Sequence, residues 1–107
     1  MAGKLERGFC AMRWIAIFSN RPDTEKLFEE NLQAHLDYFA SCPQISLAGS
    51  ITPKGARYST GGVWIIKGLE YDEAMALIKK DPFFLAGMRE KIDLYSYRVA
   101  PQFEDLV

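Results

Sequence analysis

The hydrophobic period changes several times along this chain, and the order of those changes is the strongest constraint on its fold. Four short runs rich in β-branched and aromatic residues predict strands, at 12–18, 45–51, 63–68 and 91–99. Between them, 22–41 and 71–80 carry apolar residues at helical spacing. The order βαββαβ predicts an α+β, ferredoxin-like domain, with a four-stranded antiparallel sheet and two helices on one face.

The first and third predicted strands are apolar at nearly every position. A sheet with helices on one face needs apolar residues only at alternate positions. The uncovered face should therefore carry an apolar patch that includes Trp14 or Trp64, and a soluble monomer seldom exposes such a patch. We expect a homodimer in which two copies pack sheet to sheet around a two-fold axis.

The chain is expected to form one domain over residues 12–107, because 107 residues suffice for a single core. Residues 1–11 contain two glycines, mixed charges and no hydrophobic period. We interpret them as a loosely held N-terminal extension.

Charge and cysteine content limit the partners and the compartment. The net charge of -1, with no basic block, predicts neither a nucleic-acid partner nor an anionic membrane surface. No apolar run is long enough for a signal segment or a membrane span. Cys10 and Cys42 match no zinc or redox spacing, so we expect reduced thiols in a cytoplasmic protein, with a disulfide as the alternative.

Asp81 stands directly before Pro82, after the second predicted helix. Proline disfavours the α region for the residue before it, so Asp81 should lie at a helix end and cap a short turn that begins at Pro82. That role is purely structural and common. The same geometry can also direct the carboxylate into a pocket.

His35 is the only histidine of the chain and lies on the apolar side of the first predicted helix. A histidine in such a place is more often a hydrogen-bonded core residue than a catalyst. It could meet Asp81 only if the two helix ends converge. In that case Asp81 would accept one ring N–H and fix the tautomer, while the other nitrogen would act first as base and then as acid.

Four further residues are candidates for binding a small-molecule ligand. Gly49 lies in the second predicted strand, where another backbone or a ligand can come close, and Ser50 could donate a hydrogen bond or be an ordinary strand serine. Phe83 and Phe84 would supply an apolar wall. One histidine without a carboxylate cluster argues against a metal site, and the glycines of 52–62 form no phosphate loop, so no cofactor is expected.

Three short motifs, taken together in order and spacing, resemble the YCII-related (YciI-like) family. They are His35-Leu36, Leu47-Ala48-Gly49-Ser50, and Asp81-Pro82-Phe83 with Ala86-Gly87. The resemblance covers roughly 12–99 and implies a dimeric α+β barrel with a ferredoxin-like protomer. It also implies an active site built on a histidine–aspartate pair, here His35 and Asp81.

Some members of that family are linked to the removal of chloride from chlorinated aromatic ring compounds. The chain departs from the family in its N-terminal extension, its glycine-punctuated hairpin at 52–62, and a tail in which the usual Pro-Phe is spread into Pro101-Gln102-Phe103. The tail bears on which C-terminal residues line a pocket, and it leaves the assignment of His35 and Asp81 unchanged.

The leading hypothesis is a small cofactor-independent enzyme of lyase or isomerase type, dehalogenase-like by the resemblance, that acts on a small cyclic or aromatic metabolite. The alternative is a non-catalytic dimer that binds a small ligand or regulates, in which His35 and Asp81 only bind or brace. A third hypothesis is a scaffolding role through the apolar sheet face, which predicts a different protein as partner.

Overall fold

The computed structural model describes residues 12–107, so the predicted extension at 1–11 lies outside the described residues. The elements are β1 (Arg13–Asn20), α2 (Glu25–Ala40), β2 (Ile45–Ile51), β3 (Gly61–Lys67), α3 (Tyr71–Lys79), α4 (Pro82–Leu85), β4 (Arg89–Ser96) and the 3-10 helix η1 (Pro101–Phe103). This is the predicted βαββαβ order, with the short α4 before β4. None of the helices among these residues is both long enough and apolar enough to cross a bilayer.

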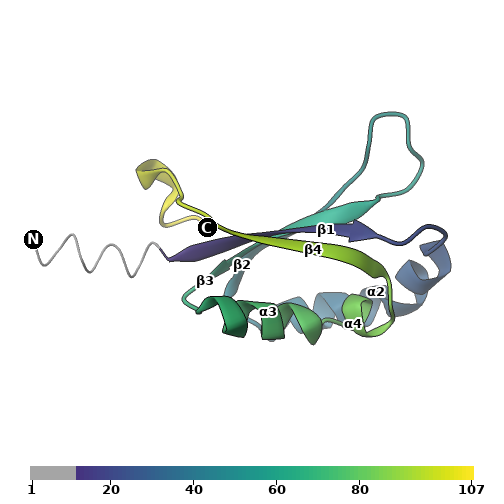
Figure 1. Cartoon of the computed structure of the whole chain (residues 1–107), viewed down its shortest axis with the longest axis horizontal. Helices are drawn as coiled ribbons and strands as arrows, with labels where there is room; N and C mark the ends of the chain where they lie inside the picture. Colours follow the sequence, from purple (N-terminus) through teal and green to yellow (C-terminus); the bar gives the residue numbers. More distant parts are fainter. Residues whose placement is uncertain (1–11) are drawn as a thin grey trace, which may run out of the picture.

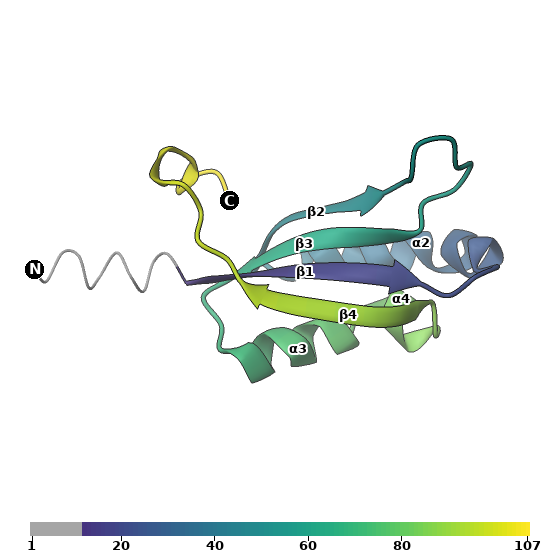
Figure 2. The same cartoon turned by 45° about the horizontal axis from the view of Figure 1, so that its top comes forward.

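The four strands form one antiparallel sheet in the order β2-β3-β1-β4. The helices α2, α3 and α4 all lie against the same face of the sheet (Figures 1 and 2). The ferredoxin-like fold is therefore confirmed. The loop between β2 and β3 and the C-terminal segment with η1 rise on the opposite side of the sheet, one at each end (Figure 1).

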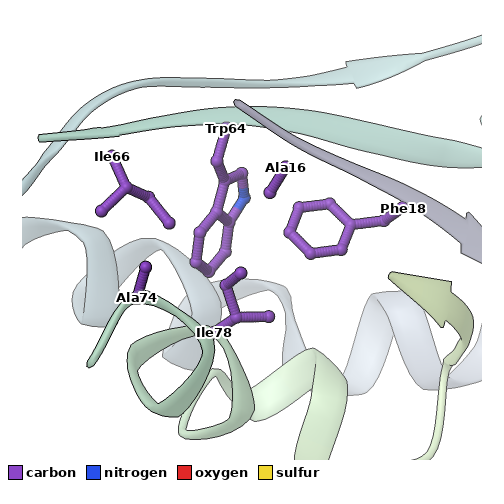
Figure 3. Packing of buried hydrophobic residues seen from close by; sticks show 6 residues of the cluster. All are labelled: Ala16, Phe18, Trp64, Ile66, Ala74 and Ile78. Carbon is purple, nitrogen blue, oxygen red and sulfur yellow. The ribbon is translucent and has the colours of Figure 1, made fainter. Parts of the chain in front are cut away.

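The core lies between the sheet and the helices. Its buried residues come from β1, β3 and α3: Ala16, Phe18, Trp64, Ile66, Ala74 and Ile78 (Figure 3). The expectation that Trp14 or Trp64 would lie on the uncovered face is wrong. Trp64 is 1% exposed within the core, and Trp14 packs against it while its Nε1 donates to the Leu69 carbonyl oxygen at 2.8 Å. Strand alternation explains this, because positions 14, 16 and 18 of β1 all point toward the helices.

The uncovered face is nevertheless apolar. Alternation and register place aliphatic side chains of the three adjacent strands there: Ile15, Ile17, Val63, Ile65 and Leu47. Leu47, on the edge strand β2, is 49% exposed. We call these five residues the sheet patch.

Gly61 begins β3, although the sequence pattern had placed it in the preceding loop. Its position against β1 accounts for the glycine, since an added Cβ would lie 1.9 Å from the backbone oxygen of Phe18. Two backbones approach here at a distance that excludes any side chain.

Replacing Gly61 by Ala should therefore destabilise the fold by about 3 kcal/mol, because the methyl group overlaps a carbonyl that cannot rotate away. We expect the midpoint of thermal unfolding, followed by circular dichroism, to fall by roughly 10 °C or more. The matched control is Gly49→Ala on β2, where no heavy atom lies within 4 Å of an added Cβ. If Gly61→Ala and Gly49→Ala had the same midpoint of thermal unfolding, the close approach of β1 and β3 would be contradicted.

Candidate active site

His35 and Asp81 form a hydrogen-bonded pair across the helical layer. His35 lies in α2 and Asp81 directly before α4, and the distance from His35 Nδ1 to Asp81 Oδ1 is 2.6 Å. The two helix ends thus converge in the way the sequence hypothesis required. A carboxylate only accepts hydrogen bonds, so Nδ1 carries the hydrogen and donates it. In the neutral form of the imidazole, Nε2 is then an acceptor.

The local backbone explains why the carboxylate is available to His35. Asp81 is the N-cap of α4 with extended dihedrals, φ -63° and ψ 133°, and Pro82 follows at the first helical position, as predicted. Its backbone N–H donates to Ile78 and its carbonyl accepts from Leu85. The side chain makes no capping hydrogen bond. The backbone alone ends one helix and begins the next.

Aromatic rings hold the imidazole in place. Phe83 stacks on His35 with 3.8 Å between ring centroids and 16° between planes, and Phe39 meets the same ring edge-on at 4.3 Å. His35 is 7% exposed and Asp81 is 1% exposed. The pair is therefore rigid and largely shielded from water, which strengthens electrostatic interactions within it.

A cavity of about 240 Å³ opens beside this pair. Of the residues proposed from the sequence, His35, Gly49, Ser50 and Phe83 lie in its wall. Asp81 is not in the wall but contacts His35 from behind, and Phe84 is not among the lining residues. The floor includes Trp64 of the core.

A second cavity of about 320 Å³ adjoins the first. Five residues line both: Asn20, Phe28, Ser50, Ser59 and Met88. Its other walls include Arg57 and Tyr58 of the loop between β2 and β3, and Glu25 and Glu29 of α2. The shared wall indicates a continuous hollow that leads from His35 toward that loop.

Arg89 and Asn20 also line the first cavity, and sequence reasoning missed both. Arg89 Nη1 donates to Asn20 Oδ1 at 2.7 Å, and Nη2 lies 3.8 Å from Asp81 Oδ2. Burial lowers the pKa of the Arg89 guanidinium, and the charge of Asp81 opposes that change. The hydrophobic pattern starts the last strand at Lys91 and leaves Arg89 outside it. A usable signal was an arginine directly after the Ala86-Gly87-Met88 turn.

The pair can accept and return a proton at Nε2 of His35, with Asp81 stabilising the imidazolium in between. No group of three His, Cys, Asp or Glu side chains within residues 12–107 is arranged to hold a metal ion. Cys42 is buried and has no disulfide partner within residues 12–107, whereas Cys10 lies outside the described residues.

A protein-family model described as the YCII-related domain matches residues 12–98. No curated protein matches this sequence.

Two of the solved structures that share the fold are named for an activity. The first is 5-chloro-2-hydroxyhydroquinone dehydrochlorinase (TftG) from Burkholderia phenoliruptrix AC1100 in complex with 2,5-dihydroxybenzoquinone, at 22% identity and a TM-score of 0.76 over 85% of this chain and 98% of that one. The second is SnoaB, a cofactor-independent oxygenase from Streptomyces nogalater, at 13% identity and a TM-score of 0.51 over 84% of this chain and 95% of that one.

Proposed function

Since this chain belongs to the YCII-related domain family, we propose that it is a small cofactor-independent enzyme of lyase or isomerase type. Its substrate would be a small cyclic or aromatic metabolite bound beside His35. The observation that carries the proposal is the 2.6 Å contact between His35 Nδ1 and Asp81 Oδ1 at the wall of a cavity. A bracing pair in a closed core would have no such opening.

His35 would remove a proton from the substrate with Nε2, and Asp81 would hold the ring and balance its positive charge. In an elimination, the electrons of the broken C–H or O–H bond form a new π bond, and the leaving group departs with its own electron pair. In an isomerisation, the imidazolium returns the proton to a different atom. Neither reaction is a net oxidation, so neither requires a redox cofactor.

The candidate substrates are halogenated hydroxyhydroquinones, by analogy with the reaction named for TftG. A cavity of about 240 Å³ has room for a single substituted ring, because a cavity of about 150 Å³ can already hold benzene. Stacked Phe83 offers the ring an apolar edge, and Ser50 offers a hydroxyl.

The test is chloride release from 5-chloro-2-hydroxyhydroquinone by the purified chain, compared with its His35→Ala variant. Release that depends on His35 would support the proposal. Equal release by both proteins, or none by either on this substrate and on its bromo analogue, would count against it.

We also propose that two copies associate through the sheet patch, as in a dimeric α+β barrel. Leu47 of the patch is exposed and Ile15, Ile17 and Val63 are partly exposed, so these apolar side chains would otherwise face water. The proposed compartment is the cytoplasm, where cysteine thiols stay reduced.

Leu47→Asp should convert the dimer to a monomer, because it introduces a charge into the sheet patch that a second copy would have to desolvate. Sedimentation velocity would show the change. Leu85→Asp is the matched control, since Leu85 is 70% exposed on α4, on the other side of the sheet. A wild-type monomer, or a Leu47→Asp dimer, would contradict this interface.

A further inference from the structure

Arg89 places a nearly buried positive charge in the wall of the cavity that holds His35. Its side chain is only 6% exposed. Moving a guanidinium out of water is costly unless its charge and its N–H groups find partners. The partners that Arg89 has are therefore informative.

A guanidinium has five N–H donors. Within the described residues Arg89 makes one side-chain hydrogen bond, from Nη1 to Asn20 Oδ1, and its buried Nε has no partner. Asp81 does not fill the deficit. Its Oδ1 accepts from His35, and its Oδ2 is 3.8 Å from Nη2, too far for a hydrogen bond. The carboxylate balances the charge of Arg89 but leaves the buried Nε–H without a partner among the described residues.

The same guanidinium is held in a fixed orientation. Its central carbon lies 4.5 Å from the ring centroid of Phe18 and 5.4 Å from that of Phe83. Phe83 also stacks on His35. One phenylalanine thus contacts both the imidazole and the guanidinium, and the two polar groups share one wall of the cavity.

We infer that Arg89 is a substrate-binding residue that takes an anionic oxygen of the ligand, so that the substrate is a small cyclic enol, phenol or carboxylic acid bound in its ionised form. The planar guanidinium of Arg89, with its unpartnered Nε–H, can donate hydrogen bonds to one such oxygen or to two oxygens of a carboxylate. The inference rests on the proposed function, in which the cavity beside His35 binds the substrate. What it adds is that this substrate binds as an anion.

This arrangement also has a consequence for the reaction. Proton removal by His35 would place negative charge on the substrate, and a fixed guanidinium stabilises that charge without having to reorganise. Arg89 would therefore contribute both to binding and to the rate.

The test is calorimetric titration of the wild-type chain, Arg89→Gln and Arg21→Gln with 2,5-dihydroxybenzoquinone and benzoate, and with neutral benzamide as the comparator. We expect Arg89→Gln to weaken binding of the acids at least tenfold and to change benzamide affinity by less than about twofold. Arg21→Gln removes the same charge from an exposed position and should bind as the wild type does. Unchanged acid binding in Arg89→Gln, or no acid binding by the wild type, would overturn the inference.

A wild-type measurement covers the case in which Arg89→Gln fails to fold. The Nε–H resonance of Arg89 should shift when 2,5-dihydroxybenzoquinone saturates the protein and stay in place with benzamide. A stationary resonance with the acid would refute the assignment. Both readouts report binding, so they remain valid if His35→Ala proves fully active and the proposed function fails.

Discussion

His35→Ala should reduce turnover by about two to four orders of magnitude, the usual contribution of a positioned acid–base group. The variant removes the only imidazole of the chain, which lies in the cavity wall. The measurement is kcat and kcat/KM for chloride release under saturating substrate. We expect kcat to fall more than KM changes, because the proton transfer takes place in the transition state.

Two further variants separate chemistry from folding. His35→Asn keeps an amide that can donate to Asp81, so it should fold like the wild type and be as inactive as His35→Ala. Gln33→Ala changes an exposed side chain of the same helix, which donates a hydrogen bond to Asp37, and should be fully active. Full activity in His35→Asn would exclude His35 as the proton carrier.

Asp81→Asn should lower the free energy of unfolding by about 3–5 kcal/mol, the usual cost of removing one partner from a buried charge pair. The carboxylate lies between His35 and Arg89, at 2.6 Å and 3.8 Å respectively. An amide would leave the buried guanidinium without a countercharge. It would also fail to stabilise the imidazolium, so turnover should fall as well.

Urea unfolding, followed by fluorescence, measures the stability of Asp81→Asn. Asp37→Asn, an exposed carboxylate on α2, is the control and should lie within about 0.5 kcal/mol of the wild type. The double variant Asp81→Asn with Arg89→Met should recover part of the loss, because neither charge is then buried alone. If Asp81→Asn were as stable as the wild type, the countercharge role of Asp81 would be wrong.

The pairing of His35 with Asp81 was within reach of the sequence because its determinants are local. Helical period places His35 on the inner side of α2, and Pro82 fixes the backbone at Asp81. The βαββαβ order then brings the two helix ends to one face of the sheet. Coordinates were needed to show that the helix ends converge and how far apart the two side chains lie.

Arg89 could not be found in the same way, because its environment depends on strand register. It pairs with Asn20 across a register shift between Ser19 and Asn20 that hydrophobic alternation does not reveal. The prediction of the sheet face on which Trp64 lies was wrong for a related reason. β3 is apolar on both faces, so its pattern does not tell which side carries the helices. Gly61 looked like a loop residue because glycine weakens strands, and the backbone of Phe18 that requires it is distant in sequence.

The two members of the pair are 46 residues apart, and the exposed loop between β2 and β3 lies between them in the chain. A single backbone cut in that loop would divide the chain into one fragment that carries the imidazole and another that carries both the carboxylate and the guanidinium. If these three groups act as proposed, neither half could turn over substrate alone. Reassociation through β3, which pairs with β1 and β2 at once, would bring all three groups together again.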